Sequence, residues 1–212
     1  MALSISPPYP PMEASLVHTI PTGEGWQYEP KWDGFRCIAF KDETKIELQS
    51  KSGQSLSRYF PELVSAVEEI KSRKLVLDGE IVIAKDGSFF FDDLLRRMDP
   101  AASIEKLAQE HHAKMIVFDL LLFGDWKLFA SQPLKERRRL LEIFCAQYLS
   151  QDSSFQLSPI TRQVDIARRW LEIADNRTNG IIAKRLALTY QSGKRTGMRK
   201  IKRPGAADRL QH

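Results

Sequence analysis

The sequence predicts an α+β fold in which antiparallel sheets are flanked by helices. Hairpin signals occur twice, because apolar strand-like segments are joined by the short polar turns 42–44 and 85–88. Segments with apolar residues at helical spacing follow each of these hairpins. No internal repeat and no linker divides the chain, so we expect these elements to pack as one unit.

The individual elements are predicted in chain order. Residues 1–25 are rich in proline and glycine and form an expected extended lead-in with little regular structure. Alternating apolar residues predict a strand over 35–40, with residues 45–53 as its hairpin partner. The later elements are a helix over 59–74 with Pro61 in its first turn, a strand pair over 74–89, short helices over 91–100 and 103–113, a buried strand over 114–126, an amphipathic helix with a basic face over 134–149, a helix over 164–178, a strand within 179–190, and a short strand in the basic segment 193–204.

The bulk composition is that of a globular protein with a basic surface. The 212 residues are 42% apolar and 28% charged, which suits one large domain or two small ones and argues against disorder. The net charge of +5 favours an anionic partner such as nucleic acid or nucleotide phosphates. Cys37 and Cys145 lack metal-ligand spacing and are expected to be free, partly buried thiols in a reducing compartment.

Targeting signals are not apparent in the sequence. No apolar run approaches the roughly 20 residues of a membrane span, and the N-terminus lacks the pattern of a signal peptide. We therefore expect a cytoplasmic protein without membrane contact.

The segment "EPKWDGFR" (29–36) concentrates reactive side chains around Lys31. The proline before this lysine fixes the local backbone, and Gly34 allows a close backbone approach or a positive φ. A lysine that is buried or close to a cation such as Arg36 shifts towards the neutral amine, which can act as a nucleophile. Asp33 could orient that amine or assist its deprotonation. The alternative is a surface strand held by salt bridges.

Two further segments place charges on one face of a strand. Asp78 and Glu80 in "LVLDGEIVI" are two residues apart, and their burial would require a partner such as a metal ion, a ribose hydroxyl or an arginine. Lys200 and Lys202 in "RKIKRP" alternate in the same way and suggest a polyphosphate between them. The alternative for the lysines is a solvated edge strand that is protected from aggregation.

The order of the motifs resembles that of the covalent nucleotidyltransferases. "KWDG", "DGE", "FDLL", "NGIIAK" and "KIK" follow one another along the chain. With "PPYPPM", "RYFPEL", "FDDLLRRMDPAAS" and "TYQSGKR", the chain resembles the adenylation domain of ATP-dependent DNA ligases, above all the C-type accessory ligases of bacteria. This resemblance implies the covalent nucleotidyltransferase (ATP-grasp-like) fold, with an adenylation domain over residues 1–205 and a tail over 206–212.

The resemblance also implies a reaction. In this family a lysine attacks the α-phosphate of ATP, pyrophosphate leaves and a lysyl-AMP forms. AMP then passes to a DNA 5′-phosphate, and the 3′-hydroxyl at the nick displaces it. By motif, Lys31 is the expected catalytic nucleophile. The expected cofactors are ATP, as the donor of AMP, and Mg²⁺ or Mn²⁺.

The same likeness assigns roles around the nucleotide. Glu29 would meet adenine and Phe118 would stack on it, and Arg36 would contact the ribose or the DNA end. Glu80 would hold the ribose or a divalent metal. Lys200 and Lys202 would bind the α-phosphate. The nucleotide-binding residues implied by the resemblance are Glu29, Asp33, Gly34, Arg36, Lys51, Glu80, Phe118, Lys184, Arg195, Lys200 and Lys202.

Three positions depart from the family pattern. Asn179 stands before the glycine of "NGIIAK", where the family usually has an acid, which puts a second metal site in doubt. Lys51 replaces an arginine, so the charge is kept and the bidentate fork is lost. Met198 stands where a tryptophan is common.

Complete ligases of this family continue into an OB-fold domain that closes over the nick. The residues after Lys202 are too few to form such a domain, so we expect either an excised catalytic core or a minimal protein that borrows its missing half from a partner. We therefore expect weak sealing by this chain alone, or help from a separate OB-fold or repair partner protein. The expected substrate is nicked double-stranded DNA in repair or recombination. The protein is expected to be a monomer in a bacterial cytoplasm, associated with the nucleoid.

Two alternative functions stay open at this point. An RNA ligase or an mRNA-capping guanylyltransferase shares the "KxDG" pattern. A non-catalytic binder of DNA ends would explain Asn179, Lys51 and the short C-terminal segment, and would bind DNA in a salt-dependent way without covalent AMP. The basic helix over 134–149 could contact the DNA backbone, or it could be a solvated face.

Overall fold

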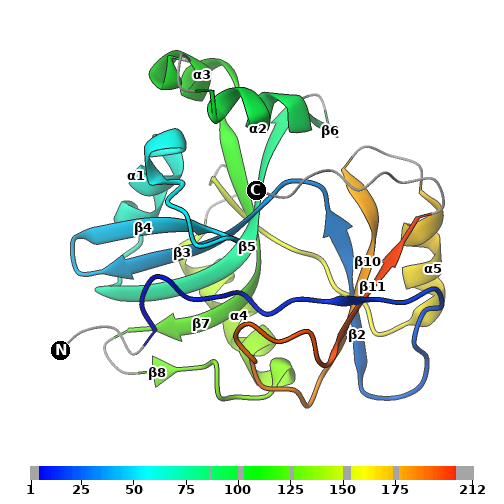
Figure 1. Ribbon diagram of the computed structural model, residues 1–212. Helices are drawn as coiled ribbons and strands as arrows, with labels where there is room; N and C mark the ends of the chain where they lie inside the picture. The colour runs from blue at the N-terminus through cyan, green and yellow to red at the C-terminus, as the bar shows by residue number, and fades with distance from the viewer. Residues whose placement is uncertain are drawn as a thin grey trace.

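Two β-sheets stand side by side at the centre of the molecule (Figure 1). The computed structural model describes residues 5–85, 87–99, 103–124, 127–149, 154–173 and 177–203. The larger sheet has seven strands, in the order β4-β3-β5-β7-β8 with β6 paired to β5 and β9 paired to β7. The smaller sheet has four strands, in the order β1-β11-β10-β2. The strands are β1 (Ser15–Leu16), β2 (Trp26–Trp32), β3 (Phe35–Asp42), β4 (Lys45–Ser50), β5 (Lys74–Lys85), β6 (Ser88–Phe89), β7 (Ala113–Phe123), β8 (Lys127–Leu128), β9 (Phe155–Leu157), β10 (Thr178–Arg185) and β11 (Met198–Lys202).

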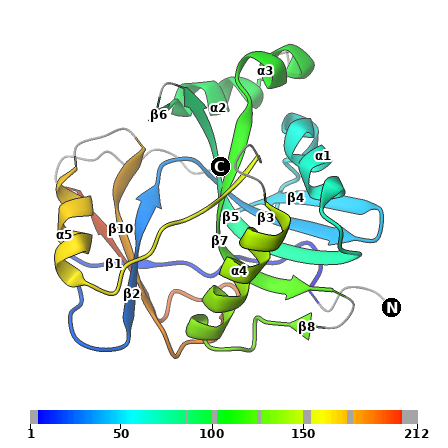
Figure 2. The same cartoon turned by 180° about the vertical axis from the view of Figure 1, so that it is seen from behind.

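Helices flank both sheets (Figure 2). In chain order they are the 3₁₀ turn η1 (Ser57–Tyr59), α1 (Pro61–Glu69), α2 (Phe91–Arg97), α3 (Ile104–Glu110), α4 (Leu134–Tyr148) and α5 (Val164–Glu172). Helices α1 and α4 pack on the larger sheet, and α5 packs on β10 and β2 of the smaller sheet. The expected α+β class with helix-flanked sheets is confirmed, and Pro61 does begin α1.

The two predicted hairpins are present, and most strand pairs are antiparallel. Cys37 faces Ser50 across β3 and β4, and Ala84 faces Phe89 across β5 and β6. Two pairs in the described ranges are parallel, which the sequence did not predict: β1 with β11, and β7 with β9. Both involve strands of only two or three residues, for which the sequence carries little periodic signal.

Strand β2 was also missed at the sequence level, and Pro30 is the physical reason. Proline cannot donate a ladder hydrogen bond, so it argues against a strand interior. In the structure β2 is an edge strand of the smaller sheet, where Pro30 lies opposite Ile181 of β10. The edge tolerates the missing donor.

The lead-in runs across the molecule from the larger sheet to the smaller one (Figure 1). Its described part, residues 5–25, is mostly irregular, as expected. Ser15 and Leu16 nevertheless pair with Arg199 and Lys200 of β11. The lead-in is therefore tied to the strand that carries the expected phosphate-binding lysines.

The basic face of α4 is only partly exposed to solvent. Arg137 directs Nε and Nη2 to the two carboxylate oxygens of Asp119 on β7, at 2.8 and 2.9 Å. Arg138 donates from Nη1 to the carbonyl of Ser158 at 2.8 Å and from Nε to Glu142 at 2.7 Å. The Arg139 side chain is 62% exposed. Two of the three consecutive arginines are thus structural, and neither alternative given for this helix holds for them.

The main core lies between the larger sheet and its helices. Burial of each large apolar side chain there contributes roughly 1.5–3 kcal/mol. Cys37 and Cys145 are buried in this core as free thiols, as predicted. Burial raises the pKa of Cys37 well above its ordinary value and that of Cys145 to about 12. Within the described ranges, no helix combines the length and the apolar character needed to cross a bilayer.

Candidate active site

The candidate site is a pocket along the seam between the two sheets. The space between its walls, about 710 Å³, includes a part that is open to solvent. Both sheets and the lead-in contribute to its walls. The lining residues are Pro11, Glu13, Ala14, Glu29, Pro30, Lys31, Trp32, Arg36, Lys51, Glu80, Phe118, Ile182, Lys184, Met198 and Lys200.

The chain crosses from the smaller sheet to the larger one shortly after Lys31. Strand β2 ends at Trp32 and β3 begins at Phe35, so Asp33 and Gly34 form the crossing. A Cβ atom on Gly34 would lie 2.1 Å from the backbone oxygen of Ile81. Gly34 is therefore needed for a close backbone approach and not for a positive φ.

Lys31 lies in a surrounding that favours its neutral form. Burial lowers the pKa of the Lys31 ammonium, and the positive charges of Lys200 and Lys202 lower it further. Glu80 and Asp33 act in the opposite direction. The net effect is a lowered pKa, which makes the amine a better nucleophile near neutral pH.

Glu80 of β5 is buried beside this lysine, and one of its carboxylate oxygens is not hydrogen-bonded within the described residues. Gly34 donates its backbone N–H to the Glu80 carboxylate, whereas the Oε1 atom has no hydrogen-bond partner among the described residues. Burial raises the pKa of Glu80 to about 7, although Arg36 and Lys31 oppose this shift. The unpaired oxygen fits a ribose hydroxyl or a divalent cation. Within the described ranges, His, Cys, Asp and Glu side chains do not gather in groups of three or more that could hold a metal ion.

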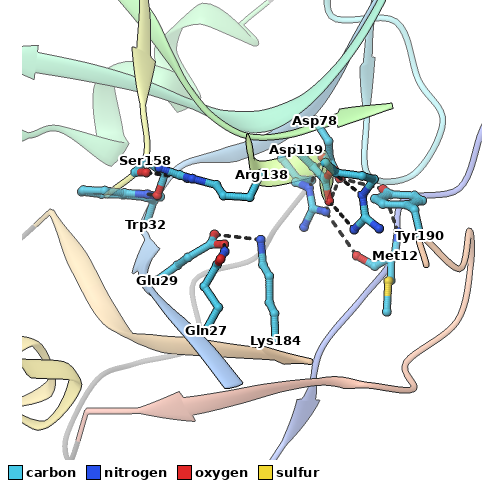
Figure 3. A network of polar contacts seen from close by, with 12 residues as sticks. Met12, Gln27, Glu29, Trp32, Asp78, Asp119, Arg138, Ser158, Lys184 and Tyr190 are labelled. Atoms are coloured by element: carbon cyan, nitrogen blue, oxygen red, sulfur yellow. Dashed lines mark hydrogen bonds and ion pairs between the residues drawn. The ribbon is translucent and has the colours of Figure 1, made fainter. Parts of the chain in front are cut away.

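A second group of polar side chains lies on the smaller sheet (Figure 3). The Glu29 carboxylate accepts from Gln27 Nε2 at 2.8 Å and from Lys184 Nζ at 2.7 Å. Lys184 also lies 4.5 Å from the centre of the Phe118 ring, and the Arg36 guanidinium lies 4.7 Å from the same ring. Gln27 is fully buried, and its Oε1 lacks a partner among the described residues.

Arg36 is held in place by a buried network that includes Asp78 and Tyr190, two residues labelled in Figure 3. It donates from Nε and Nη2 to the two oxygens of Asp78, at 2.6 and 2.7 Å. Tyr190 donates its hydroxyl to Asp78 at 2.6 Å and accepts the backbone N–H of Met12 at 3.0 Å. Burial raises the pKa of Tyr190 well above its ordinary value, and the nearby Asp78 raises it further. Of the three partners that the sequence allowed for Asp78, a metal ion, a ribose hydroxyl or an arginine, the structure shows an arginine.

Several expected site residues lie at the edge of the pocket or outside its lining. Asp33 accepts a hydrogen bond from Asn179 Nδ2 at 3.1 Å, and Asn179 Oδ1 is buried without a partner among the described residues. Arg195 is exposed and lies 3.2 Å from Glu13. Lys202 is close enough to lower the pKa of Lys31 but does not line the pocket.

The structure also reveals residues that sequence reasoning did not single out. Glu13, Gln27 and Tyr190 each bind a residue of the expected site: Glu13 pairs with Lys51, Gln27 with Glu29, and Tyr190 with Asp78. Tyr190 lies in the quoted segment "TYQSGKR". Gln27 lies two residues from Glu29 on the same strand face. No sequence signal points to Glu13, because its partners lie far along the chain.

Comparison with known proteins gives one consistent result. A family model described as "ATP dependent DNA ligase domain" matches residues 11–202. DNA ligase C2 of Mycolicibacterium smegmatis is 42% identical over 98% of this chain, and DNA ligase C of Mycobacterium tuberculosis is 40% identical over 98% of it. The chain spans 57% and 58% of the length of these two relatives.

Solved structures share the fold. The ligase domain of M. tuberculosis LigD superposes with a TM-score of 0.72 at 23% identity, over 92% of this chain and 59% of that one. A mycobacterial DNA ligase D complexed with ATP and MES gives a TM-score of 0.70 at 24% identity, over 92% of this chain and 60% of that one. The motif order, the fold and the family model agree, and the chain therefore belongs to the family of ATP-dependent DNA ligase domains.

Proposed function

We propose that this chain forms a lysyl-AMP from ATP, as the first step of joining DNA ends. The observation that carries the proposal is the position of Lys31, which lines the seam pocket with a lowered pKa and cations on several sides. The neutral Nζ attacks the α-phosphorus, and a nitrogen–phosphorus bond forms. The bond between the α-phosphorus and the bridging oxygen breaks, pyrophosphate leaves and the amine proton is lost to water.

The base and the ribose would lie against the groups that both sheets present. Phe118 offers an apolar ring for stacking on adenine. Glu29 would accept from the amino group of adenine, with Lys184 at its side. Glu80 would use its unpaired oxygen for a ribose hydroxyl or for a divalent metal.

The phosphates would lie among positive charges, which phosphoryl transfer requires more than an acid–base relay. Lys200 lines the pocket and would contact the α-phosphate. Lys202 lies two residues further along β11, outside the pocket lining, and would contact the same phosphate from there. Lys51 and Arg195 would reach phosphates further out. Mg²⁺ or Mn²⁺, when bound with ATP, would neutralise charge on the phosphates.

The later steps are proposed from the relatives. Two proteins named as DNA ligases cover this chain almost completely, so the proposed acceptor of AMP is the 5′-phosphate of nicked double-stranded DNA. Because sealing requires both DNA ends to be positioned, we expect weak sealing by the present chain without further protein. A separate OB-fold or repair protein is the proposed partner.

Label transfer from [α-³²P]ATP tests the proposal. The chain with ATP and magnesium should become covalently labelled, and the Lys31→Ala variant should not. Lys71→Ala is the matched control, because Lys71 is an exposed lysine after α1. Label that persists on Lys31→Ala would remove Lys31 as the nucleophile. Labelling by GTP in place of ATP would favour a capping-type enzyme, and salt-dependent DNA binding without label would favour a non-catalytic DNA-end binder.

A further inference from the structure

Glu13 of the lead-in lies between two cations at the edge of the seam pocket. A single oxygen, Oε2, lies 3.0 Å from Lys51 Nζ and 3.2 Å from Arg195 Nη2. The three residues come from the lead-in, from the segment after β4 and from the segment between β10 and β11. Glu13 therefore pairs with Lys51 and Arg195, two side chains that are expected to bind phosphate.

The main chain around Glu13 is fixed on both sides. Its own N–H donates to the carbonyl of Lys194 at 2.9 Å, and the N–H of Gly193 donates to the carbonyl of Pro10 at 3.2 Å. The N–H of Val17 donates to the carbonyl of Lys200 at 3.0 Å. The carboxylate can therefore leave its partners by side-chain rotation, whereas displacement of the lead-in would break these bonds.

The ion pairs themselves are weak and partly solvated. The side chains of Glu13, Lys51 and Arg195 are 26%, 33% and 69% exposed. Exposed ion pairs contribute little to stability, so a phosphate group with more charge and more acceptor oxygens can replace the carboxylate. Burial alone would raise the pKa of Glu13, but Lys51 and Arg195 lower it overall, so the competitor stays ionised at neutral pH.

We propose that Glu13 takes the place of a phosphate group between Lys51 and Arg195 when no phosphate is bound, and so lowers the affinity of the protein for phosphate by competition. The inference rests on the proposed function for the source of that phosphate. The source is either the outer phosphates of ATP or the 5′-phosphate of a DNA nick. The chemistry of recognition, two cations on one phosphate group, is the same for both.

The test replaces Glu13 with glutamine and measures binding without turnover. One arm titrates the chain with α,β-methylene-ATP and magnesium, since this analogue cannot release pyrophosphate. A second arm titrates nicked duplexes that carry either a 5′-phosphate or a 5′-hydroxyl. Glu13→Gln should bind one phosphate-bearing probe about threefold to tenfold more tightly, with no gain for the 5′-hydroxyl duplex.

Glu43→Gln is the matched control. Glu43 pairs with Arg73 in an exposed ion pair on the β3–β4 turn, and its substitution removes the same charge without touching the pocket. It should leave every affinity unchanged. Glu13→Ala should reproduce the gain of Glu13→Gln, which excludes an effect of the new amide.

The outcomes distinguish ATP from DNA as the source of the phosphate, and they test the inference on Glu13 separately from the proposed function. Tighter binding of the analogue alone assigns the site to ATP, and tighter binding of the 5′-phosphate duplex alone assigns it to DNA. Unchanged or weaker binding of both probes by Glu13→Gln overturns the inference and makes Glu13 a residue that positions Lys51. Label from [α-³²P]ATP on the same preparations tests the proposed function separately, because binding competition does not require lysyl-AMP to form.

Discussion

Lys31 carries the proposed chemistry, and its surroundings govern when it can react. Burial and the two lysines of β11 lower its pKa, whereas Glu80 and Asp33 raise it. The sequence predicted the presence of a nucleophile from Gly34 and Arg36 around it. It could not predict the balance of charges, because Glu80 and Lys200 reach the pocket from distant strands.

The pH dependence of self-adenylylation should report the lowered pKa of Lys31. Since only the neutral amine attacks, the single-turnover rate should rise with pH and level off at a midpoint below 10.5, the ordinary value for lysine. Lys202→Ala should move the midpoint upward, because it removes a cation that lowers the pKa of Lys31. Label incorporation measured from about pH 6 to about pH 10 checks this. A midpoint at the ordinary lysine value would contradict it.

Glu80 gives a prediction about stability. Its folded-state pKa of about 7 exceeds the ordinary 4.5, so its ionisation destabilises the fold progressively as pH rises between these values. Glu80→Gln, which resembles the protonated acid, should stabilise the protein by on the order of 2 kcal/mol at about pH 8 and have little effect near pH 4.5. Urea unfolding at both pH values measures this. An equal gain at both pH values would argue against a raised pKa.

At the scale of elements, strong periodic signals were predictive and short strands were not. The hairpin of β3 and β4 and the helix α1 follow directly from alternation and helical spacing. Strand β2 was hidden by Pro30, which is tolerated because β2 is an edge strand and its pairing with β10 shifts register beside this residue. The burial of Arg137 and Arg138 on α4 depends on Asp119 and on the Ser158 carbonyl. Those partners become neighbours only in the folded chain.

The crossing between β2 and β3 should not tolerate a side chain. A methyl group on Gly34 would collide with the backbone oxygen of Ile81 and displace Lys31, so Gly34→Ala should slow self-adenylylation by on the order of 100-fold. Single-turnover labelling measures the effect. Near-normal labelling of Gly34→Ala would show that the crossing has room to adjust.

Gly87→Ala is the control for the crossing. Its positive φ of 76° also disfavours alanine, so this variant bears a backbone cost of its own. No heavy atom lies within 4 Å of the place that its Cβ would take, and Gly87 does not line the pocket. Gly87→Ala should therefore label at a near-normal rate, even if its stability falls.

Tyr190 joins the lead-in to β5 through one hydroxyl. Tyr190→Phe would leave the Met12 N–H without its acceptor and would remove one of the bonds to Asp78, the partner of Arg36. We expect a loss of about 1–3 kcal/mol in the free energy of unfolding and weaker binding of ATP. Denaturant unfolding and titration with α,β-methylene-ATP measure the two effects. Unchanged stability would mean that the network is not cooperative.

At the scale of the whole molecule, the pocket exists because two sheets and the lead-in meet at one seam. The sequence motifs predicted most of the residues that line it, since those residues recur in a fixed order. Glu13 and Gln27 were missed because they lie in no recognised motif and contact the site through a partner. Tyr190 lies in "TYQSGKR", but its role depends on Asp78, which is distant in the sequence. Asn179 remains the clearest departure, and it contacts Asp33 at the crossing.

Sealing should be the weaker of the proposed activities. The chain spans 57% to 58% of the length of two DNA ligase relatives, and the seam pocket is the proposed place of the nucleotide step alone. We expect lysyl-AMP formation with few nicks sealed per protein molecule, because both DNA ends must be held in line. A gel assay on a nicked duplex, with protein below substrate, measures turnover. Robust multiple-turnover sealing would contradict this expectation.

Intact mass spectrometry tests the central claim most directly. The folded protein is measured alone, after incubation with ATP and magnesium, and again after addition of pyrophosphate. We predict a gain of one AMP that pyrophosphate reverses and that Lys31→Ala does not show. The absence of any gain with magnesium or manganese, or the same gain on Lys31→Ala, would contradict the account of Lys31 as the nucleophile.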